Sequence, residues 1–462
     1  MLIFASDSHL NKHYARMTPD QLAERRTRLR LGLERTIDYA LAAGAHGYIH
    51  GGDLFDGPNP RAVEMVWAAK QFQRLADGGV RSFLIGGNHD IPKTRHAGAT
   101  PQRLFDAVRL ATVFTDPARV QWWCGDLDGV RVAIGGLPPD PRLPAEDDPL
   151  ALVLDALEPP EADVRLLVTH YALEDTLHPL AAEPTIKKAS VAALAGRVDA
   201  VLVGHIHEAR ITEIAGVKVI FPGPTERLSF GEIDVACGFI RLDVAPRGRG
   251  PAGAAVTATA LPLEPQPMRR HTLRATDVPA DDPTPWLVDQ IRRLSSPDQI
   301  LQLRLEGPLP RDVYHALHLR EAWRVGQDLN FYFDLDRRRL VVVDDEVKLT
   351  RSAGRVSPRG EIARVADALA EGVGTPADRA LVEAARALVL ERYGQGAIQD
   401  DGRRDGDGDR EEVAIPGAAA DAVDAVDAVD AVDAVESGDA TVTPAALDGA
   451  ASTDPAEAAW TP

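Results

Sequence analysis

Five short apolar segments in the first half of the sequence each end in residues that bind metals or transfer protons. In chain order these endings read Asp7-Ser8-His9, Gly51-Gly52-Asp53, Gly87-Asn88-His89-Asp90, Thr169-His170 and Gly204-His205-Ile206-His207. In Asp-x-His and His-x-His the outer side chains lie two positions apart, so an extended backbone turns both to the same side. A single histidine after a strand is usually a structural residue, but five such endings together indicate a binding site.

The donor types at these endings favour a pair of divalent ions. Seven candidate ligands offer carboxylate, amide or imidazole donors without a thiolate: Asp7, His9, Asp53, Asn88, His170, His205 and His207. Such a set suits Mn²⁺, Fe²⁺ or Zn²⁺, and we expect Mn²⁺ foremost. Seven ligands are too many for one ion, whereas two ions about 3.5–4 Å apart share a bridging carboxylate.

The charge balance of this site indicates a phosphate substrate. Two divalent ions outweigh the carboxylates of Asp7 and Asp53 and leave a net charge of about +2. Such a pair lowers the pKa of a bound water and stabilises the charge that develops on a phosphoryl group. The predicted reaction is in-line hydrolysis of a phosphoester.

The elements that must position these residues alternate between strands and helices. Strands are predicted at Met1–Ser6, Gly47–His50, Val80–Ile85, Val130–Ile134, Arg165–Thr169, Ala200–Val203, Val217–Phe221, Phe239–Val244 and Val256–Leu263. Apolar residues at helical spacing predict a helix between the first two strands, with Gly44 at its end. This alternation predicts an α/β domain over residues 1–268, which binds its ligands at the carboxyl ends of the strands.

Three further parts are expected after this domain. A small α/β unit at 269–350 is predicted with strands at 271–277 and 300–305, helices at 286–294 and 311–325, and a hairpin across 330–333 and 339–343. Residues 351–394 predict two amphipathic helices that are interrupted at Gly374-Thr375-Pro376, either as an appendage or as a docking surface. Residues 395–462 contain DAVDAVDAVDAVDAV, whose period of three fits neither helix nor strand, so we expect an acidic disordered tail.

Composition limits the partners and the compartment. The 462 residues carry a net charge of −19, but 16 acidic residues against three arginines lie in 401–462, so residues 1–400 carry only −6. This mild acidity leaves room for a local basic path for DNA. Two cysteines without a CxxC pair exclude a disulfide framework, and the sequence lacks the apolar run of about 18 residues that a membrane span needs. We expect a cytoplasmic protein that does not enter a membrane.

The ordered motifs DxH, GGD, GNHD, H and GHxH over residues 7–207 resemble those of the calcineurin-like metallophosphoesterases. This resemblance implies a β-sandwich flanked by helices. It implies one ion held by Asp7, His9, Asp53 and His207, and a second held by Asp53, Asn88, His170 and His205. His89 would then be the general acid toward the leaving oxygen, with Asp90 orienting its ring. The alternative for Asp90 is a turn or helix-capping residue.

Two segments resemble the SbcD-type DNA repair exonucleases: the opening SDSHL, and FPGPTERLSFGE after GHxH. This resemblance implies exonuclease and endonuclease action on DNA, a capping domain at 269–350, a homodimer, and helices at 351–394 that dock on an SbcC-type coiled-coil ATPase. Two positions depart from the family. Pro224 replaces a more usual serine, and Asp56 in GGDLFD stands where non-bacterial relatives have a catalytic histidine, so we expect a turn or capping role for Asp56.

A DNA path needs positive charge near the site. We expect Arg227, Lys93 and Arg95 to contact the phosphate backbone or a nucleotide; the alternative for Arg227 is a surface ion pair with Glu232. The arginines of the first helix are predicted to form a solvated face: Arg25, Arg26, Arg28, Arg30 and Arg35.

Two other functions compete with a DNA nuclease. A stand-alone phosphodiesterase for a small nucleotide would use the same motifs, because they do not choose the phosphoester. A non-catalytic DNA-binding scaffold would not need the complete set of ligands. The sequence therefore favours an enzyme.

Overall fold

A computed structural model of the protein describes residues 1–93, 99–176, 183–246, 248–250, 255–343, 358–372 and 376–397. The chain divides into two compact units, 1–350 and 351–462. Arg95 and the acidic segment 398–462 lie outside the described residues.

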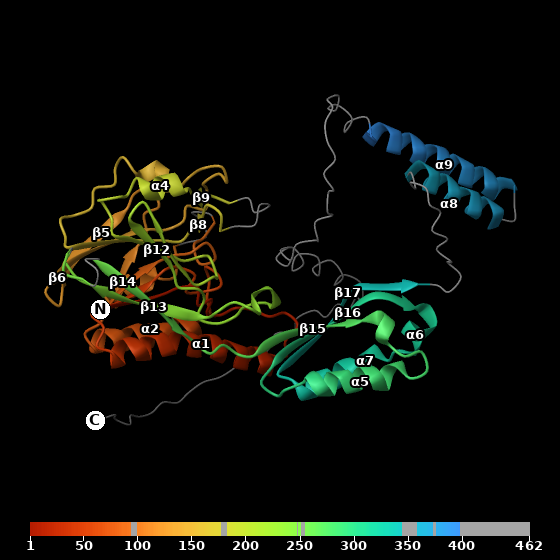
Figure 1. Ribbon diagram of the computed structural model, residues 1–462, viewed down its shortest axis with the longest axis horizontal. Helices are drawn as coiled ribbons and strands as arrows, with labels where there is room; N and C mark the ends of the chain where they lie inside the picture. The colour runs from red at the N-terminus through yellow and green to blue at the C-terminus, as the bar shows by residue number, and fades with distance from the viewer. Residues whose placement is uncertain are drawn as a thin grey trace, which may run out of the picture. The chain divides into compact units, whose positions relative to one another are not determined.

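The first unit contains two six-stranded mixed sheets (Figure 1). The first sheet runs, in spatial order, β14 (Val256–Pro262), β13 (Gly238–Val244), β1 (Leu2–Ala5), β2 (Gly47–His50), β3 (Arg81–Ile85) and β4 (Thr112–Phe114). The second runs β11 (Arg210–Ile214), β12 (Val217–Phe221), β10 (Ala200–Val203), β7 (Val164–Thr169), β6 (Val130–Leu137) and β5 (Gln121–Leu127). In each sheet four adjacent strands are parallel, namely β1 to β4 and β12, β10, β7 and β6, so their carboxyl ends share one edge.

Alternate residues of these strands enter different cores because successive side chains point to opposite faces. In β1, Leu2 and Phe4 pack between the sheets against residues such as Leu166 of β7. Ile3 instead packs on the outer face with α1 (Pro19–Ala42) and α2 (Ala62–Asp77). The two sheets therefore form a sandwich covered by helices, and the predicted α/β fold class is confirmed.

The other elements of this part are short. They are α3 (Arg103–Ala107), α4 (Lys188–Ala192), the two-stranded pair β8 (Ala172–Leu173) and β9 (Thr185–Ile186), and the 3₁₀ turns η2 (Ala151–Val153) and η3 (Phe230–Glu232). Of these, η3 bears directly on the site, because it lies in the segment that follows GHxH.

A three-stranded parallel sheet follows the sandwich. Its strands are β15 (Met268–Arg274), β16 (Ile300–Pro310) and β17 (Tyr332–Val343), accompanied by η5 (Ala275–Asp277), α5 (Pro283–Leu294), α6 (Arg311–Ala316) and α7 (Leu319–Leu329). One face of the sheet packs on the helices through its own apolar core, which includes Leu303 of β16 and Ile291 of α5. Because β15 begins at Met268, the domain boundary that we propose at residue 268 falls at the start of this unit.

Two predictions for this unit are wrong. The expected hairpin is a single strand, β17, parallel to β16. Its charged middle looks like a turn, but Asp336 is buried and accepts hydrogen bonds from Arg304 Nε (2.9 Å) and Arg338 Nε (3.0 Å), so the strand continues. The expected helix at 311–325 is divided between α6 and α7.

The prediction of a solvated arginine face on α1 is also wrong at one position. Arg25 is fully buried, because it lies one turn before Leu29 on the stripe that faces the core. Its Nη1 atom donates to Gln266 Oε1 at 2.9 Å and lies 3.4 Å from a carboxylate oxygen of Glu226, while Nη2 donates to the carbonyl of Arg227. Arg25 therefore links α1 to the segment before β15.

The described part of the second unit consists of α8 (Pro358–Gly372) and α9 (Pro376–Ala397), which pack against each other. Both predicted helices are therefore confirmed, whereas Gly374 and Thr375 of the predicted interruption lie outside the described residues. Large apolar side chains on both helices are exposed: Val365, Leu369, Leu381, Leu388 and Val389. None of the helices in the described ranges is long and apolar enough to cross a membrane.

Candidate active site

Five parallel strands from the two sheets deliver the candidate ligands to one place. Asp7 and His9 follow β1, Asp53 follows β2, Asn88 follows β3, His170 follows β7, and His205 and His207 follow β10. The loops are tied to one another, since the amide of Asp7 donates to the carbonyl of Gly52 (3.1 Å) and the amide of His9 to that of Asp53 (3.0 Å). The structure therefore brings all seven predicted ligands together at the carboxyl edge of both sheets.

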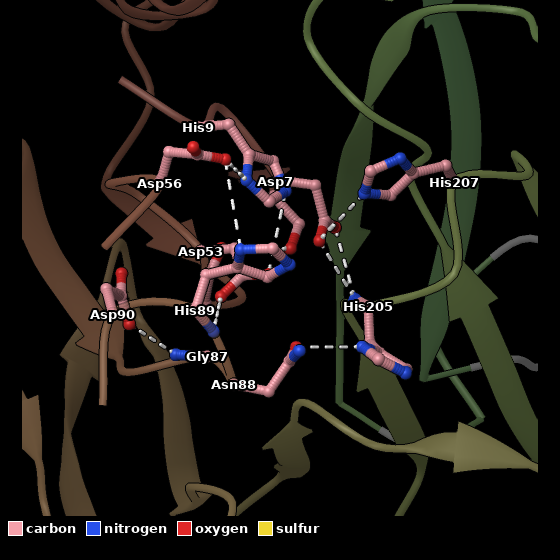
Figure 2. Close-up of polar contacts among 12 residues, drawn as sticks. Asp7, His9, Asp53, Asp56, Gly87, Asn88, His89, Asp90, His205 and His207 are labelled. Atoms are coloured by element: carbon pink, nitrogen blue, oxygen red, sulfur yellow. Dashed lines mark hydrogen bonds and ion pairs between the residues drawn. The ribbon is translucent and has the colours of Figure 1, made fainter. Parts of the chain in front are cut away.

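Figure 2 labels six of these residues, all but His170, and their side chains point toward one another. Asp53 Oδ2 lies 3.5 Å from His9 Nε2 and 3.3 Å from His170 Nε2. Asp7 Oδ1 lies 3.6 Å from His207 Nε2 and 3.9 Å from His170 Nε2. Each of two sets, Asp7 with His9 and His207, and Asp7 with Asp53 and His170, offers donor atoms within 4.8 Å of one another.

Asn88 adds a neutral oxygen to the second of these sets. Its Oδ1 lies 3.1 Å from His170 Nε2 and 2.9 Å from His205 Nδ1. Asp7 in turn holds the loop of His205, whose backbone amide donates to Asp7 Oδ1 at 3.1 Å. The carboxylates, the amide and the imidazoles thus form one continuous cluster.

The residues present fit a pair of divalent ions. His9 Nε2 is buried and makes no hydrogen bond within the described residues, which leaves its lone pair directed into the cluster. A buried polar atom without a partner is costly, and a bound cation removes that cost. Gly87 leaves room for the carboxylates, since a Cβ atom there would lie 2.1 Å from Asp53 Oδ1.

The carboxylates and imidazoles of the cluster shift one another's pKa values. Burial would raise the pKa of Asp53, but His170 and His9 hold it well below its usual range. Burial would also raise the pKa of Asp7, which His207 and His170 keep low. Burial would lower the pKa of both histidines. Asp53 and Asp7 nevertheless raise the pKa of His170 to about 9. Asp7 and Glu232 raise the pKa of His207 to about 10.

The outer nitrogen of each candidate histidine ligand has an acceptor. His9 Nδ1 lies 3.0 Å from Asp56 Oδ1, His207 Nδ1 2.9 Å from Glu232 Oε1, His205 Nε2 3.0 Å from Glu183 Oε1, and His170 Nδ1 2.7 Å from the carbonyl oxygen of Gly51. Such partners fix which ring nitrogen is free to bind a metal. Nε2 therefore faces the cluster in His9, His170 and His207, whereas Nδ1 faces it in His205.

Three of these acceptors are functional residues that sequence reasoning missed. The sequence predicts a turn or a cap at Asp56, but its carboxylate contacts His9 and accepts a hydrogen bond from Lys12 Nζ at 3.0 Å. For Glu232 the sequence suggests only an ion pair with Arg227, whereas its carboxylate contacts His207. Both stand in motifs that the sequence already singled out, GGDLFD and SFGE, whereas no local signal marks Glu183.

His89 lies at the solvent side of this cluster. Its side chain is 42% exposed, and its ring meets the ring of His9 edge-on with the centroids 4.8 Å apart. Its backbone amide donates to Asp53 Oδ1 at 2.9 Å. Burial of the imidazole lowers the pKa of His89, while Asp53 opposes that shift.

The expected orientation of His89 by Asp90 is corrected by the structure. The buried carboxylate of Asp90 accepts hydrogen bonds from the amides of Gly87 (2.6 Å) and Phe55 (3.3 Å) and from the side chain of Gln102. Asp90 therefore holds the GNHD turn, which was the alternative reading, and burial raises its pKa to about 8. The carboxylate of Asp56 lies 3.8 Å from Nδ1 of the His89 ring (Figure 2).

The predicted DNA contacts are only partly described. Arg227 is half-buried, and its Nε donates to the carbonyl of Val235 at 3.1 Å, so the alternative of a surface pair with Glu232 is wrong. Lys93 is exposed, and Arg95 lies outside the described residues.

Backbone strain is concentrated among the candidate ligands. Asp7, His9, Asp53 and His205 have positive φ angles of 53°, 42°, 50° and 82°. Residues other than glycine rarely adopt this conformation. The fold therefore holds these side chains in place at some energetic cost.

Comparison with known proteins finds a family model that spans this site. Residues 2–209 match the family model of the calcineurin-like phosphoesterases. The match includes all seven candidate ligands, in the region where the motifs and their order predict this resemblance.

The relatives that the chain resembles are DNA repair proteins. Proteins named DNA double-strand break repair protein Mre11 are similar to it. The one from Haloferax volcanii is 30% identical over 213 residues, which cover 46% of this chain and 43% of that protein. The one from Sulfurisphaera tokodaii is 26% identical over 219 residues, which cover 47% and 52%. The matched region thus spans about half the length of these relatives.

Proposed function

We propose that the protein is a two-metal nuclease that hydrolyses phosphodiester bonds of DNA in double-strand-break repair or recombination, with exonuclease and endonuclease activity. The observation that carries this proposal is the convergence of seven metal-binding side chains at the edge of a calcineurin-like phosphoesterase domain whose relatives are named as break repair proteins. Mn²⁺ suits the mixed oxygen and nitrogen donors.

The chain's own residues divide the work as follows. Asp7, His9, Asp53 and His207 would hold one ion, and Asp53, Asn88, His170 and His205 the other. When bound, the ions activate a water and stabilise negative charge on the phosphoryl group. Asp53 also accepts a hydrogen bond from the backbone amide of His89, so this candidate ligand fixes the loop of the proposed general acid. His89, exposed at the edge of the cluster, is placed to protonate the leaving oxygen.

The proposal includes partners. The exposed apolar residues of α8 and α9, among them Leu381 and Leu388, suit the docking of an SbcC-type coiled-coil ATPase. We also propose a homodimer acting on DNA in the cytoplasm, with Arg227, Lys93 and Arg95 near the phosphate backbone.

Purified protein incubated with Mn²⁺ and either linear duplex DNA or a cyclic nucleotide tests the substrate. We expect metal-dependent shortening of the DNA, abolished by a chelator. Cleavage of the cyclic nucleotide alone would support a stand-alone phosphodiesterase and reject the nuclease. Co-purification with the ATPase, lost in a Leu381→Glu, Leu388→Glu variant, tests the partner.

A further inference from the structure

The 3₁₀ turn η3 places Glu232 between a candidate metal ligand and the loop that follows GHxH. Glu232 Oε1 lies 2.9 Å from His207 Nδ1, and Oε2 accepts from the amide of Leu228 at 2.6 Å. Both carboxylate oxygens are therefore engaged, and the side chain is only 16% exposed. Glu232 is thus fixed at one end by its own loop and at the other by the imidazole.

The same turn rests on the three-stranded unit. Arg270 Nη2 of β15 donates to the carbonyl of Phe230 at 3.2 Å. The side chains of Phe230 and Ile233 pack against Met268, Ile300 and Tyr332 of β15, β16 and β17. The first residue of η3 is therefore fixed by the β15–β17 sheet, and its last residue contacts the active site.

This arrangement controls the chemistry of His207. When Nδ1 donates to a carboxylate, the imidazole keeps its free lone pair on Nε2, and the ring plane is fixed. That Nε2 atom faces Asp7 Oδ1 at 3.6 Å. Without Glu232 the half-buried ring would be free to change its tautomer and to rotate.

We propose that Glu232 is a positioning residue for His207, and that the seating of η3 on the β15–β17 sheet sets how firmly this ligand is held. The proposal rests on the proposed function only in that His207 binds a metal; it does not require DNA as the substrate. A movement of the sheet would then change metal affinity through Phe230, Glu232 and His207.

Mn²⁺ binding to the full chain, measured by calorimetry without any substrate, tests the first part. Glu232→Ala should weaken one of the two sites by about 10–100-fold, and Glu232→Gln, which keeps one acceptor oxygen, should fall between that variant and the wild type. Glu208→Gln is the matched control, because it removes a negative charge from an exposed residue adjacent to His207. Wild-type affinity at both sites in Glu232→Ala would overturn the proposal.

Hydrolysis of bis(p-nitrophenyl) phosphate over a range of Mn²⁺ concentrations distinguishes a loss of His207 orientation from a general disruption of the active site. Excess Mn²⁺ should restore kcat in Glu232→Ala, because this variant loses only the contact that orients His207. Circular dichroism melting shows whether each variant is folded. A folded Glu232→Ala protein with a low kcat at saturating Mn²⁺ would contradict a role that acts only through His207.

Phe230→Ala tests the link to the sheet, since it leaves Glu232 and all ligands unchanged. It should weaken the same Mn²⁺ site, and its effect should not add to that of Glu232→Ala in a double-mutant cycle. Val66→Ala, an exposed apolar residue of α2, is the control. Unchanged Mn²⁺ affinity in Phe230→Ala would overturn the proposed link between the β15–β17 sheet and the metal site.

A wild-type protein that binds two ions but cleaves no DNA would contradict only the proposed nuclease function, and the inference about Glu232 would stand.

Discussion

The carboxylate of Asp56 lies 3.0 Å from Nδ1 of His9, while the other ring nitrogen of His9 faces Asp53 at 3.5 Å. The imidazole of His9 thus lies between a carboxylate and another candidate metal ligand, and a carboxylate partner of this kind orients a ligand and raises its basicity. Asp56 also lies 3.8 Å from the ring of the predicted general acid, His89.

Replacing Asp56 by Asn should lower Mn²⁺ affinity or kcat by about 10-fold or more, because the amide has no charge to support His9. Calorimetry and phosphodiester hydrolysis measure the two effects. Lys12→Met is the control, since it removes a different partner of Asp56 and leaves the bond to His9. Unchanged affinity and kcat in Asp56→Asn would show that the contact has no role.

His89→Ala should reduce kcat on DNA by about 10²–10⁴-fold, the usual contribution of a general acid. The loss on bis(p-nitrophenyl) phosphate should be much smaller, because p-nitrophenolate leaves without a proton. Metal content, measured on the same samples, should stay at the wild-type value. Equal losses on both substrates would argue against proton donation by His89.

Gly87→Ala should abolish tight Mn²⁺ binding, because the new Cβ atom would lie 2.1 Å from Asp53 Oδ1 and 2.4 Å from the Asp53 amide nitrogen. Gly57→Ala adds the same atom where nothing lies within 4 Å, so its affinity should match the wild type. Calorimetry compares the two. Normal binding by Gly87→Ala would mean that Asp53 is free to move.

Metal binding should release protons at neutral pH. Before an ion binds, the carboxylates of the site raise the pKa of His170 to about 9 and of His207 to about 10 against the effect of burial, so we expect both rings to carry a second proton at neutral pH. An ion must displace these protons, so apparent affinity should increase with pH until both pKa values are passed. Calorimetric titrations in two buffers of different ionisation enthalpy count the protons. Equal heats in both buffers would contradict the prediction.

Arg25→Ala should lower the free energy of unfolding by about 3–5 kcal/mol, because it leaves the buried carboxylate of Glu226 without its cation. Arg28→Ala, which breaks more exposed pairs on the same helix, should lower it by less than about 1 kcal/mol. Urea unfolding measures both. Similar values for the two variants would show that the buried pair adds little.

The sequence predicted the ligand set and the parallel strands because both depend on local patterns. An apolar segment followed by Asp, Asn or His identifies a strand and the residue at its end, as at Ile85 and Asn88. The order of motifs along the chain then identified the superfamily.

What sequence reasoning missed depends on contacts between distant residues. Asp336 looks like a turn residue until Arg304, from the neighbouring strand, is seen to pair with it. Arg25 looks like one more surface arginine, although its partners Glu226 and Gln266 lie more than 200 positions away. Asp90 stands beside His89 in sequence, yet its carboxylate faces the backbone on the other side of the turn.

Stability and activity conflict at four positions whose backbone is left-handed, namely Asp7, His9, Asp53 and His205. Each such residue costs about 1–3 kcal/mol of folding free energy, and glycine at these positions would relieve that strain while deleting a ligand. Laboratory evolution that selects only for thermal stability should therefore accumulate substitutions at these four positions and yield proteins that are more stable but inactive. Selection that includes metal-dependent cleavage should preserve all four.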